Sequence, residues 1–124
     1  MDTIFNLGTE RTLLWQNANP SAAFAAQTVQ LGVNLGQYDY IHIIVTGVNY
    51  NDTSLLVEPG DPFTFSIAMF SSSVAAAYTS NVLRSGQVLT NGVQFNACAA
   101  GYDGNWGFAT NTRLIPKKIY GIKL

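Results

Sequence analysis

The sequence predicts an all-β protein, an antiparallel β-sandwich of the jelly-roll type, and three observations support this. Turn-forming Asn, Gly, Ser and Thr recur about every 8–12 residues, as between the strands of sandwiches and barrels. Apolar and polar side chains alternate in several intervening segments, as they do in strands with one buried face. Signals for α-helices are nearly absent. With 124 residues the chain has the length of one domain, residues 1–124.

The N-terminal third contains three expected strands. The first is Thr12–Gln16, which ends at a turn over residues 17–20, and the second covers about residues 24–31. The third, residues 38–47, carries the strongest strand pattern of the chain.

This third strand is apolar on one face and half apolar on the other. Ile41, Ile43 and Val45 alternate to form the first face; the second face consists of Tyr40, His42, Ile44 and Thr46. A strand with apolar residues on both faces belongs either at the centre of a sandwich or at a subunit interface.

The middle of the chain predicts a strand followed by an ambiguous segment. The turn cluster of residues 58–62 leads into Phe63–Met69, where apolar side chains alternate with small or polar ones, and Ser71–Ser73 is expected to end this strand. Residues 74–84 contain three alanines, which favour a helix, together with strand-forming residues. We interpret them as a strand, with a short helix within residues 71–83 as the alternative.

The C-terminal third predicts a hairpin, a loop and a closing strand. Asn91-Gly92 has the composition of a type I′ turn and connects two strand-like flanks within Gln87–Phe95. Residues 101–108 are expected to form a glycine-rich aromatic loop. Residues 114–124 are expected to form the last strand, with Pro116 at its start or on an edge because proline lacks an amide hydrogen.

The charge of the chain is low and unevenly distributed. Only 10% of the residues are charged, against a usual share of about 25%, which suggests that protein covers part of the surface. The net charge of −1 argues against nucleic acid as a partner. Residues 1–83 have a net charge of −5 and residues 84–124 a net charge of +4. This asymmetry suits head-to-tail assembly, but folding can also simply interleave the two halves.

The sequence predicts neither an enzyme nor a metal or cofactor site. The single histidine, His42, lies within a strongly apolar strand, and no Gly-x-Ser-x-Gly motif is present. Residues 103–105 resemble part of a calcium loop but lack its terminal glutamate. The single cysteine, Cys98, excludes an internal disulfide, and its alanine neighbours suggest a small buried thiol.

No segment predicts export or membrane insertion. The N-terminal region lacks the basic start and apolar core of a signal peptide, and no apolar run approaches the ~20 residues of a membrane span. We therefore expect a protein made in the cytoplasm that has no contact with a membrane.

The loop of residues 101–108 has a composition that suits a sugar ligand. Tyr102 and Trp106 offer stacking faces, and Asp103 and Asn105 offer hydrogen-bond partners. These four residues are candidate glycan contacts. The alternative is that the rings are core plugs folded under the loop.

Two segments at the ends of the chain resemble a module of bacteriophage tail-fibre, baseplate and minor virion proteins. The first has Leu14-Trp15, then Phe24-Ala25-Ala26-Gln27, then Tyr38-Asp39 opening a hydrophobic strand. The second has Ile115-Pro116 followed by residues 119–123, Ile-Tyr-Gly-Ile-Lys. The resemblance implies an all-β virion component, often trimeric, on the outside of the particle.

The chain departs from this pattern because it has no coiled-coil or shaft segment. Two interpretations are therefore possible. The chain is either a separately encoded head-decoration or tail-tip subunit, or a domain of a longer fibre.

The sequence thus leads to two hypotheses of function. The first is a phage virion structural protein that forms a homo-oligomer, most simply a trimer, binds other virion proteins and contacts host surface glycans. Its expected oligomer interface consists of Tyr40, His42, Ile44, Tyr120 and Ile122. The alternative is a carbohydrate-binding module that uses the loop of residues 101–108.

Overall fold

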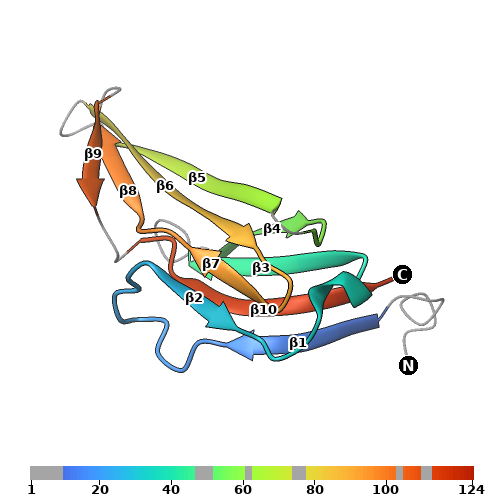
Figure 1. The fold of residues 1–124 in the computed structure, drawn as a ribbon. Helices are drawn as coiled ribbons and strands as arrows, with labels where there is room; N and C mark the ends of the chain where they lie inside the picture. Colours follow the sequence, from blue (N-terminus) through green and yellow to red (C-terminus); the bar gives the residue numbers. More distant parts are fainter. Residues whose placement is uncertain (1–9, 47–51, 61–62, 74–77, 103–104, 110–112) are drawn as a thin grey trace, which may run out of the picture.

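A computed structural model describes residues 10–46, 52–60, 63–73, 78–102, 105–109 and 113–124, and the described residues form ten strands (Figure 1). The strands are β1 (Glu10–Gln16), β2 (Gln27–Gln30), β3 (Tyr40–Thr46), β4 (Asp52–Val57), β5 (Phe63–Ser73), β6 (Tyr78–Val88), β7 (Gly92–Phe95), β8 (Ala99–Tyr102), β9 (Asn105–Ala109) and β10 (Pro116–Lys123). Within this part of the chain the one helical element is a 3₁₀ turn, η1 (Leu35–Gln37).

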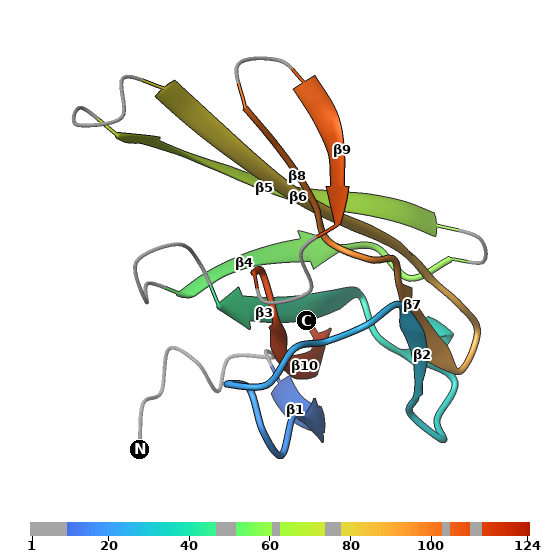
Figure 2. The ribbon, with the colours of Figure 1, turned by 90° about the vertical axis from the view of Figure 1, so that its left-hand side faces the viewer.

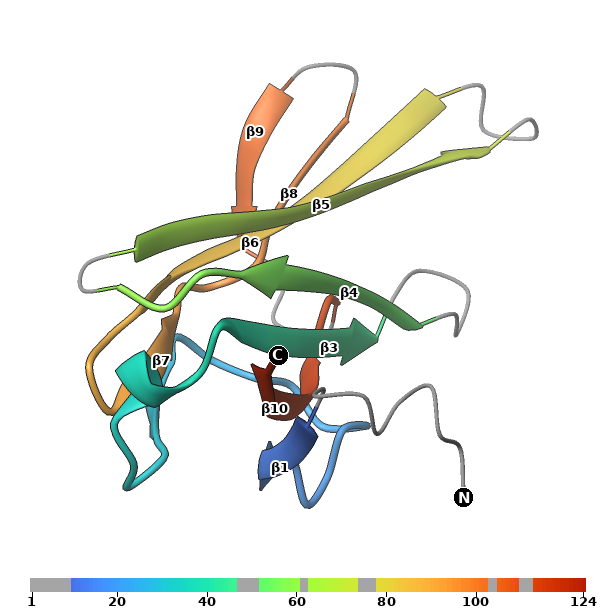
Figure 3. The ribbon, with the colours of Figure 1, turned by 90° about the vertical axis from the view of Figure 1, so that its right-hand side faces the viewer.

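The strands form two antiparallel sheets, which confirms the predicted β-sandwich. The four-stranded sheet has the order β1-β10-β3-β4. In the six-stranded sheet β6 is the long central strand: β5 pairs with one edge, and β7 and β8 pair with different parts of the other edge and continue to β2 and β9. Figures 2 and 3 show β8, β9 and the adjoining ends of β5 and β6 rising away from the four-stranded sheet. The jelly-roll description stays a prediction.

The core lies between the sheets and contains the first face of the predicted third strand. Ile41, Ile43 and Val45 are fully buried, as the alternation in the sequence predicts. Four aromatic rings extend this core towards the six-stranded sheet through edge-to-face contacts with centroid distances of 6.1, 5.6 and 5.9 Å, in the order Trp15, Phe24, Phe95 and Phe65. Each fully buried aliphatic or aromatic side chain contributes about 1.5–3 kcal/mol relative to an exposed one.

A fully buried arginine, Arg84, joins distant parts of the chain through backbone carbonyl groups. Its Nε donates to the carbonyl oxygen of Leu114 at 2.9 Å, and its Nη2 donates to that of Arg113 at 3.0 Å. Its Nη1 donates to the carbonyl oxygens of Phe24 at 3.1 Å and Asn96 at 2.9 Å. Arg84 therefore connects the centre of the six-stranded sheet to the segment that leads into β10.

The strand β5 is longer than the sequence predicts. Ser71–Ser73 do not end it, because they pair with Ser80, Thr79 and Tyr78 of β6. Regular backbone pairing with a long neighbour thus outweighs the turn preference of three serines. The alternative of a short helix within residues 71–83 is also wrong for residues 71–73 and 78–83, which are strands; residues 74–77 lie outside the described part.

The predicted hairpin between β6 and β7 exists, but its turn is not of type I′. Val88 pairs with Val93, and the Leu89 amide donates to the Gly92 carbonyl at 2.8 Å. A type I′ turn requires a positive φ at both of its central residues. Of the described residues only Leu114 and Gly32 have a positive φ, so Asn91 and Gly92 do not form such a turn. Gly92 instead belongs to β7, where a Cβ atom would lie 2.6 Å from the carbonyl oxygen of Val29 in β2. This close approach of two strands explains the glycine.

The two oppositely charged halves of the chain interleave in the fold. The basic strand β10 lies between β1 and β3. Lys117 forms an ion pair with Asp52, and the amide of Leu124 donates to the Asp39 carboxylate at 2.7 Å. The opposite charges of the two halves thus pair within one chain, which favours interleaving by folding over head-to-tail assembly.

Candidate functional site

The outer face of the four-stranded sheet contains all five residues predicted to form an oligomer interface. Tyr40, His42, Ile44, Tyr120 and Ile122 are half-buried and alternate with inward-facing residues of β3 and β10. The antiparallel register pairs Ile122 with Tyr40 and Tyr120 with His42. Residues from two distant segments therefore form one surface, which we call the outer face.

One row of side chains crosses all four strands of the outer face. Leu13 of β1 pairs with Tyr120 of β10, Tyr120 pairs with His42 of β3, and His42 pairs with Leu56 of β4. The two leucines at the ends of this row are 47% and 57% exposed, which are large fractions for aliphatic side chains. Directly opposite side chains in such a row are close neighbours, so the row is a band with leucines at both ends and a tyrosine and a histidine at its centre. We call it the apolar row.

Two basic side chains modify the aromatic centre of this band. The Arg11 guanidinium lies 3.6 Å from the centroid of the Tyr120 ring, a cation–π contact. Burial by itself raises the pKa of Tyr120, but the hydrogen bond and charge of Arg11, together with Lys118, outweigh this effect and lower it. The outer face thus presents a positively charged guanidinium over a tyrosine ring, and Arg and Tyr are both enriched at protein interfaces.

His42 lies at the centre of the row, and its surroundings favour the neutral imidazole. Its ring centroid is 6.1 Å from that of Tyr120, with the two planes tilted by 30°. Partial burial, followed by the positive charge of Arg11, lowers the pKa of His42. Its neighbours in the row are Tyr120 of β10 and Leu56 of β4.

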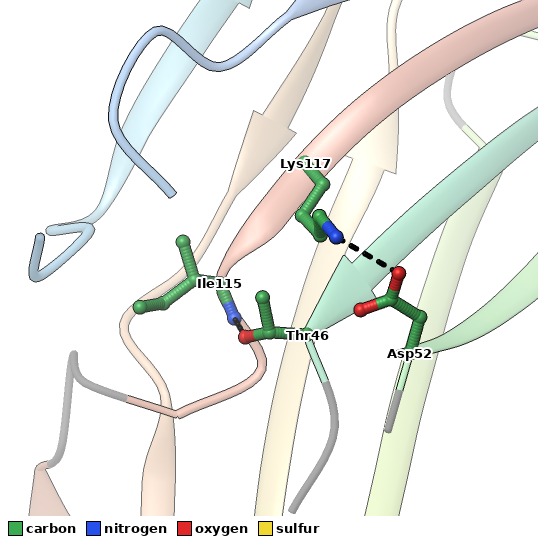
Figure 4. Close-up of polar contacts among 4 residues, drawn as sticks. All are labelled: Thr46, Asp52, Ile115 and Lys117. Atoms are coloured by element: carbon green, nitrogen blue, oxygen red, sulfur yellow. Dashed lines mark hydrogen bonds and ion pairs between the residues drawn. The ribbon is translucent and has the colours of Figure 1, made fainter. Parts of the chain in front are cut away.

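Polar contacts fix one border of the outer face, where β10 begins (Figure 4). Lys117 Nζ lies 2.8 Å from Asp52 Oδ2 of β4, and the Ile115 amide donates to Thr46 Oγ1 of β3 at 3.0 Å. The register between β10 and β3 shifts between Pro116 and Lys118. These contacts hold the start of β10 against the ends of β3 and β4, and so set the alignment of the rows. Pro116 begins β10, as predicted.

Sequence reasoning missed three members of the outer face: Arg11, Leu13 and Leu56. The register of β1 shifts between Leu13 and Trp15, so strict alternation along this strand assigns its faces incorrectly. Leu56 belongs to β4, which was not among the expected strands. Its signal is the apolar run Leu55-Leu56-Val57 directly before the turn at Glu58-Pro59-Gly60.

Three of the four candidate glycan contacts, Tyr102, Asn105 and Trp106, lie near the end of the β8–β9 hairpin. The predicted loop of residues 101–108 is wrong in part, because Tyr102 pairs with Asn105 and Gly101 pairs with Trp106. Asp103 lies outside the described residues. The backbone thus brings Tyr102, Asn105 and Trp106 together at one end of the six-stranded sheet, well away from the outer face (Figures 1 and 2).

Other sites receive little support from the described residues. Cys98 is fully buried, and burial raises the pKa of its thiol, as expected for a structural cysteine. In the ranges that the structure describes, no three His, Cys, Asp or Glu side chains gather as metal ligands would. The same ranges contain no helix with the length and apolar character needed to cross a membrane.

Comparisons with known proteins add no relative to this description. The chain matches no protein-family model, no curated protein and no solved structure.

Proposed function

We propose that the chain is a structural subunit of a bacteriophage virion and that it assembles into a homo-oligomer, most simply a trimer, through its outer face. The virion assignment rests on the resemblance of the segments around Trp15 and Tyr120 to phage structural modules. Its place is a tail fibre, tail tip, head fibre or capsid decoration. In this role the protein is not an enzyme, uses no cofactor, and binds other virion proteins.

The observation that carries the assembly proposal is the apolar row from Leu13 to Leu56. A solvated face of an antiparallel sheet is usually polar, whereas this face exposes two leucines beside a tyrosine and a histidine. Contiguous apolar surface framed by polar residues marks interaction sites. Lys118 and Ser54 continue the outer face beyond the row and supply this polar frame.

A second role within the same proposal is contact with a host surface glycan at the end of the β8–β9 hairpin. Tyr102 pairs with Asn105 there, whereas Trp106 pairs with Gly101, and successive strand residues belong to opposite faces of a sheet. These residues lie near the end of a hairpin that points away from the outer face (Figure 2). A subunit that assembles through one sheet and binds a sugar at the far end of the other is a receptor-binding virion protein. A carbohydrate-binding module without assembly is the alternative function.

Sedimentation velocity tests the assembly. We expect the wild-type chain to sediment as an oligomer and Leu56→Lys to weaken that oligomer by tenfold or more, because the variant places a charge in the apolar row. Thr28→Lys is the matched control, since Thr28 is an exposed strand residue of the other sheet. A wild-type chain that is monomeric at every concentration, or a Leu56→Lys variant with wild-type assembly, contradicts the proposal.

Particle purification tests the virion assignment. Lysates are prepared from the bacteria that naturally produce the protein and are separated on a density gradient. We expect the chain to sediment with phage particles, in a fixed ratio to the other virion proteins. A chain that stays in the soluble fraction contradicts the assignment without affecting the assembly result.

A further inference from the structure

The strand β5 forms an edge of the six-stranded sheet, which lies opposite the outer face. All eleven residues of β5 pair with β6 without a register shift, from Phe63 opposite Val88 to Ser73 opposite Tyr78. Among the described strands β6 is the only partner of β5, so its other side is an edge of the six-stranded sheet. Figure 3 shows this edge running along the front of the molecule, uncovered by any described strand.

The β5 edge lacks the features that protect the edges of natural sheets. Such edges are usually short, charged, bulged or interrupted by proline. The edge strand β1 has the charges of Glu10 and Arg11 as well as a register shift, and the edge strand β4 begins at Asp52. The edge strands β2 and β9 have four and five residues. In contrast, β5 has eleven residues with no charge, no proline and no register shift.

We propose that this edge pairs with β5 of a second copy of the chain, antiparallel and centred on Ala68. In this arrangement Ala68 lies opposite Ala68 of the other copy and all eleven residues of each strand are paired. Even-numbered residues then pair with even-numbered ones, so that the buried side chains Phe65 and Ile67 stay on the core side in both copies. The six-stranded sheets of the two molecules become one continuous sheet.

The strand is self-complementary, which supports a second copy as its partner. Across the twofold axis no like charges face each other, because β5 has none. The pairs that include the exposed residues of β5 are Thr64 with Ser72, Ser66 with Phe70, and Ala68 with itself, all of them uncharged. Thr64, Ser66 and Ala68 are exposed in the single chain, so pairing needs no rearrangement of the core.

Opposite charges introduced by substitution at Ala68, the centre of this edge, test the pairing. We expect Ala68→Lys alone and Ala68→Glu alone to weaken the edge contact at least tenfold, because each places like charges face to face. An equimolar mixture of the two should restore the edge contact and with it the wild-type mass distribution in native mass spectrometry. Thr28→Lys is the control for an added charge on the same sheet. A wild-type mass distribution in either variant, or a mixture that does not reassociate, overturns the proposal.

A measurement on the wild-type chain avoids any effect of the substitutions on folding. We expect amide hydrogens of the β5 peptide to be protected from exchange at high protein concentration and to exchange faster after dilution, while β2 amides do not change. Protection of β5 that is independent of concentration overturns the proposal.

The proposal for the β5 edge goes beyond the proposed function. The experiments distinguish a failure of this proposal from a failure of the outer-face proposal. If both operate, Leu56→Lys leaves a dimer and Ala68→Lys leaves the outer-face oligomer. If only the edge proposal is wrong, Ala68→Lys has the wild-type mass. If only the outer-face proposal is wrong, the wild-type chain is a dimer and Ala68→Lys makes it a monomer.

Discussion

Ile43 and Ile44 are neighbours in β3, yet they belong to two regions that need different explanations. Ile43 faces the core and is fully buried, together with Ile41 and Val45. Ile44 faces outwards and is half-buried within the single chain. The fold alone accounts for the inner face, because a sandwich needs an apolar layer between its sheets. It does not account for an outer face with Tyr, His, Ile and Leu, so the difference points to a partner outside the chain.

Among the described residues Arg84 is the one charged side chain buried in the core, and its replacement has the largest expected effect. Arg84→Met removes the four hydrogen bonds to backbone carbonyls while retaining apolar volume, and it leaves buried acceptors without that donor. We expect a loss of about 3–5 kcal/mol in the free energy of unfolding, measured by urea denaturation. Arg84→Lys, which keeps the charge but not the planar set of donors, should lose less. A change below about 1 kcal/mol for Arg84→Met would show that the core does not depend on this arginine.

Arg84 also illustrates which features the sequence could predict. Alternation within single strands predicted the two faces of β3, because the side-chain period of a strand is local information. The partners of Arg84 come from Phe24, Asn96 and the pair Arg113-Leu114, and no local pattern connects them. The same limit applies to the outer face. Its residues in β3 and β10 were predicted, but Leu13 was not, because the register of β1 shifts between Leu13 and Trp15.

Backbone context explains the incorrect turn assignments. The sequence Asn91-Gly92 favours a type I′ turn, but Gly92 is needed within β7, where β2 approaches closely. Ser71–Ser73 favour a break, but the full length of β6 is available as a pairing partner. In both places a neighbouring strand that is remote from the local pattern decides the outcome.

An effect of intermediate size is expected from the pH dependence of His42, which belongs to the outer face and not to the core. Because burial and Arg11 lower the pKa of His42 in the folded chain, the unfolded chain binds more protons below the ordinary pKa of about 6.5. The stability linked to neutral His42 is complete above that pH and is lost as the pH falls through the lowered value. Assembly through the outer face should weaken in the same direction, since protonation of His42 adds a second positive charge near that of Arg11.

Sedimentation at about pH 7.5 and about pH 5.5 measures this effect. We expect the wild-type oligomer to weaken at the lower pH and His42→Gln, which stays uncharged, to lose most of this dependence. An equal pH dependence in the variant would place the titrating group elsewhere.

The smallest effect on stability is expected at the end of the β8–β9 hairpin. If Trp106 contacts a glycan, Trp106→Ala should leave the thermal midpoint nearly unchanged and weaken glycan binding by about 1–3 kcal/mol. Trp15→Ala is the control, because Trp15 packs edge-to-face on Phe24 and its loss should cost about 2–3 kcal/mol of stability. A loss of about 3–5 kcal/mol for Trp106→Ala would identify a core ring instead.

The paired substitutions Ile44→Asp and Ile43→Asp test the central claim most directly, that one strand serves the core on one face and assembly on the other. Sedimentation and thermal melting are measured in the Ala68→Lys background, where the β5 edge adds no mass. We predict that Ile44→Asp is a folded monomer with a melting temperature near that of its parent, and that Ile43→Asp is unfolded. An Ile44→Asp chain that keeps the parent's oligomer, or a parent chain that is monomeric and unfolds with either substitution, would contradict the account.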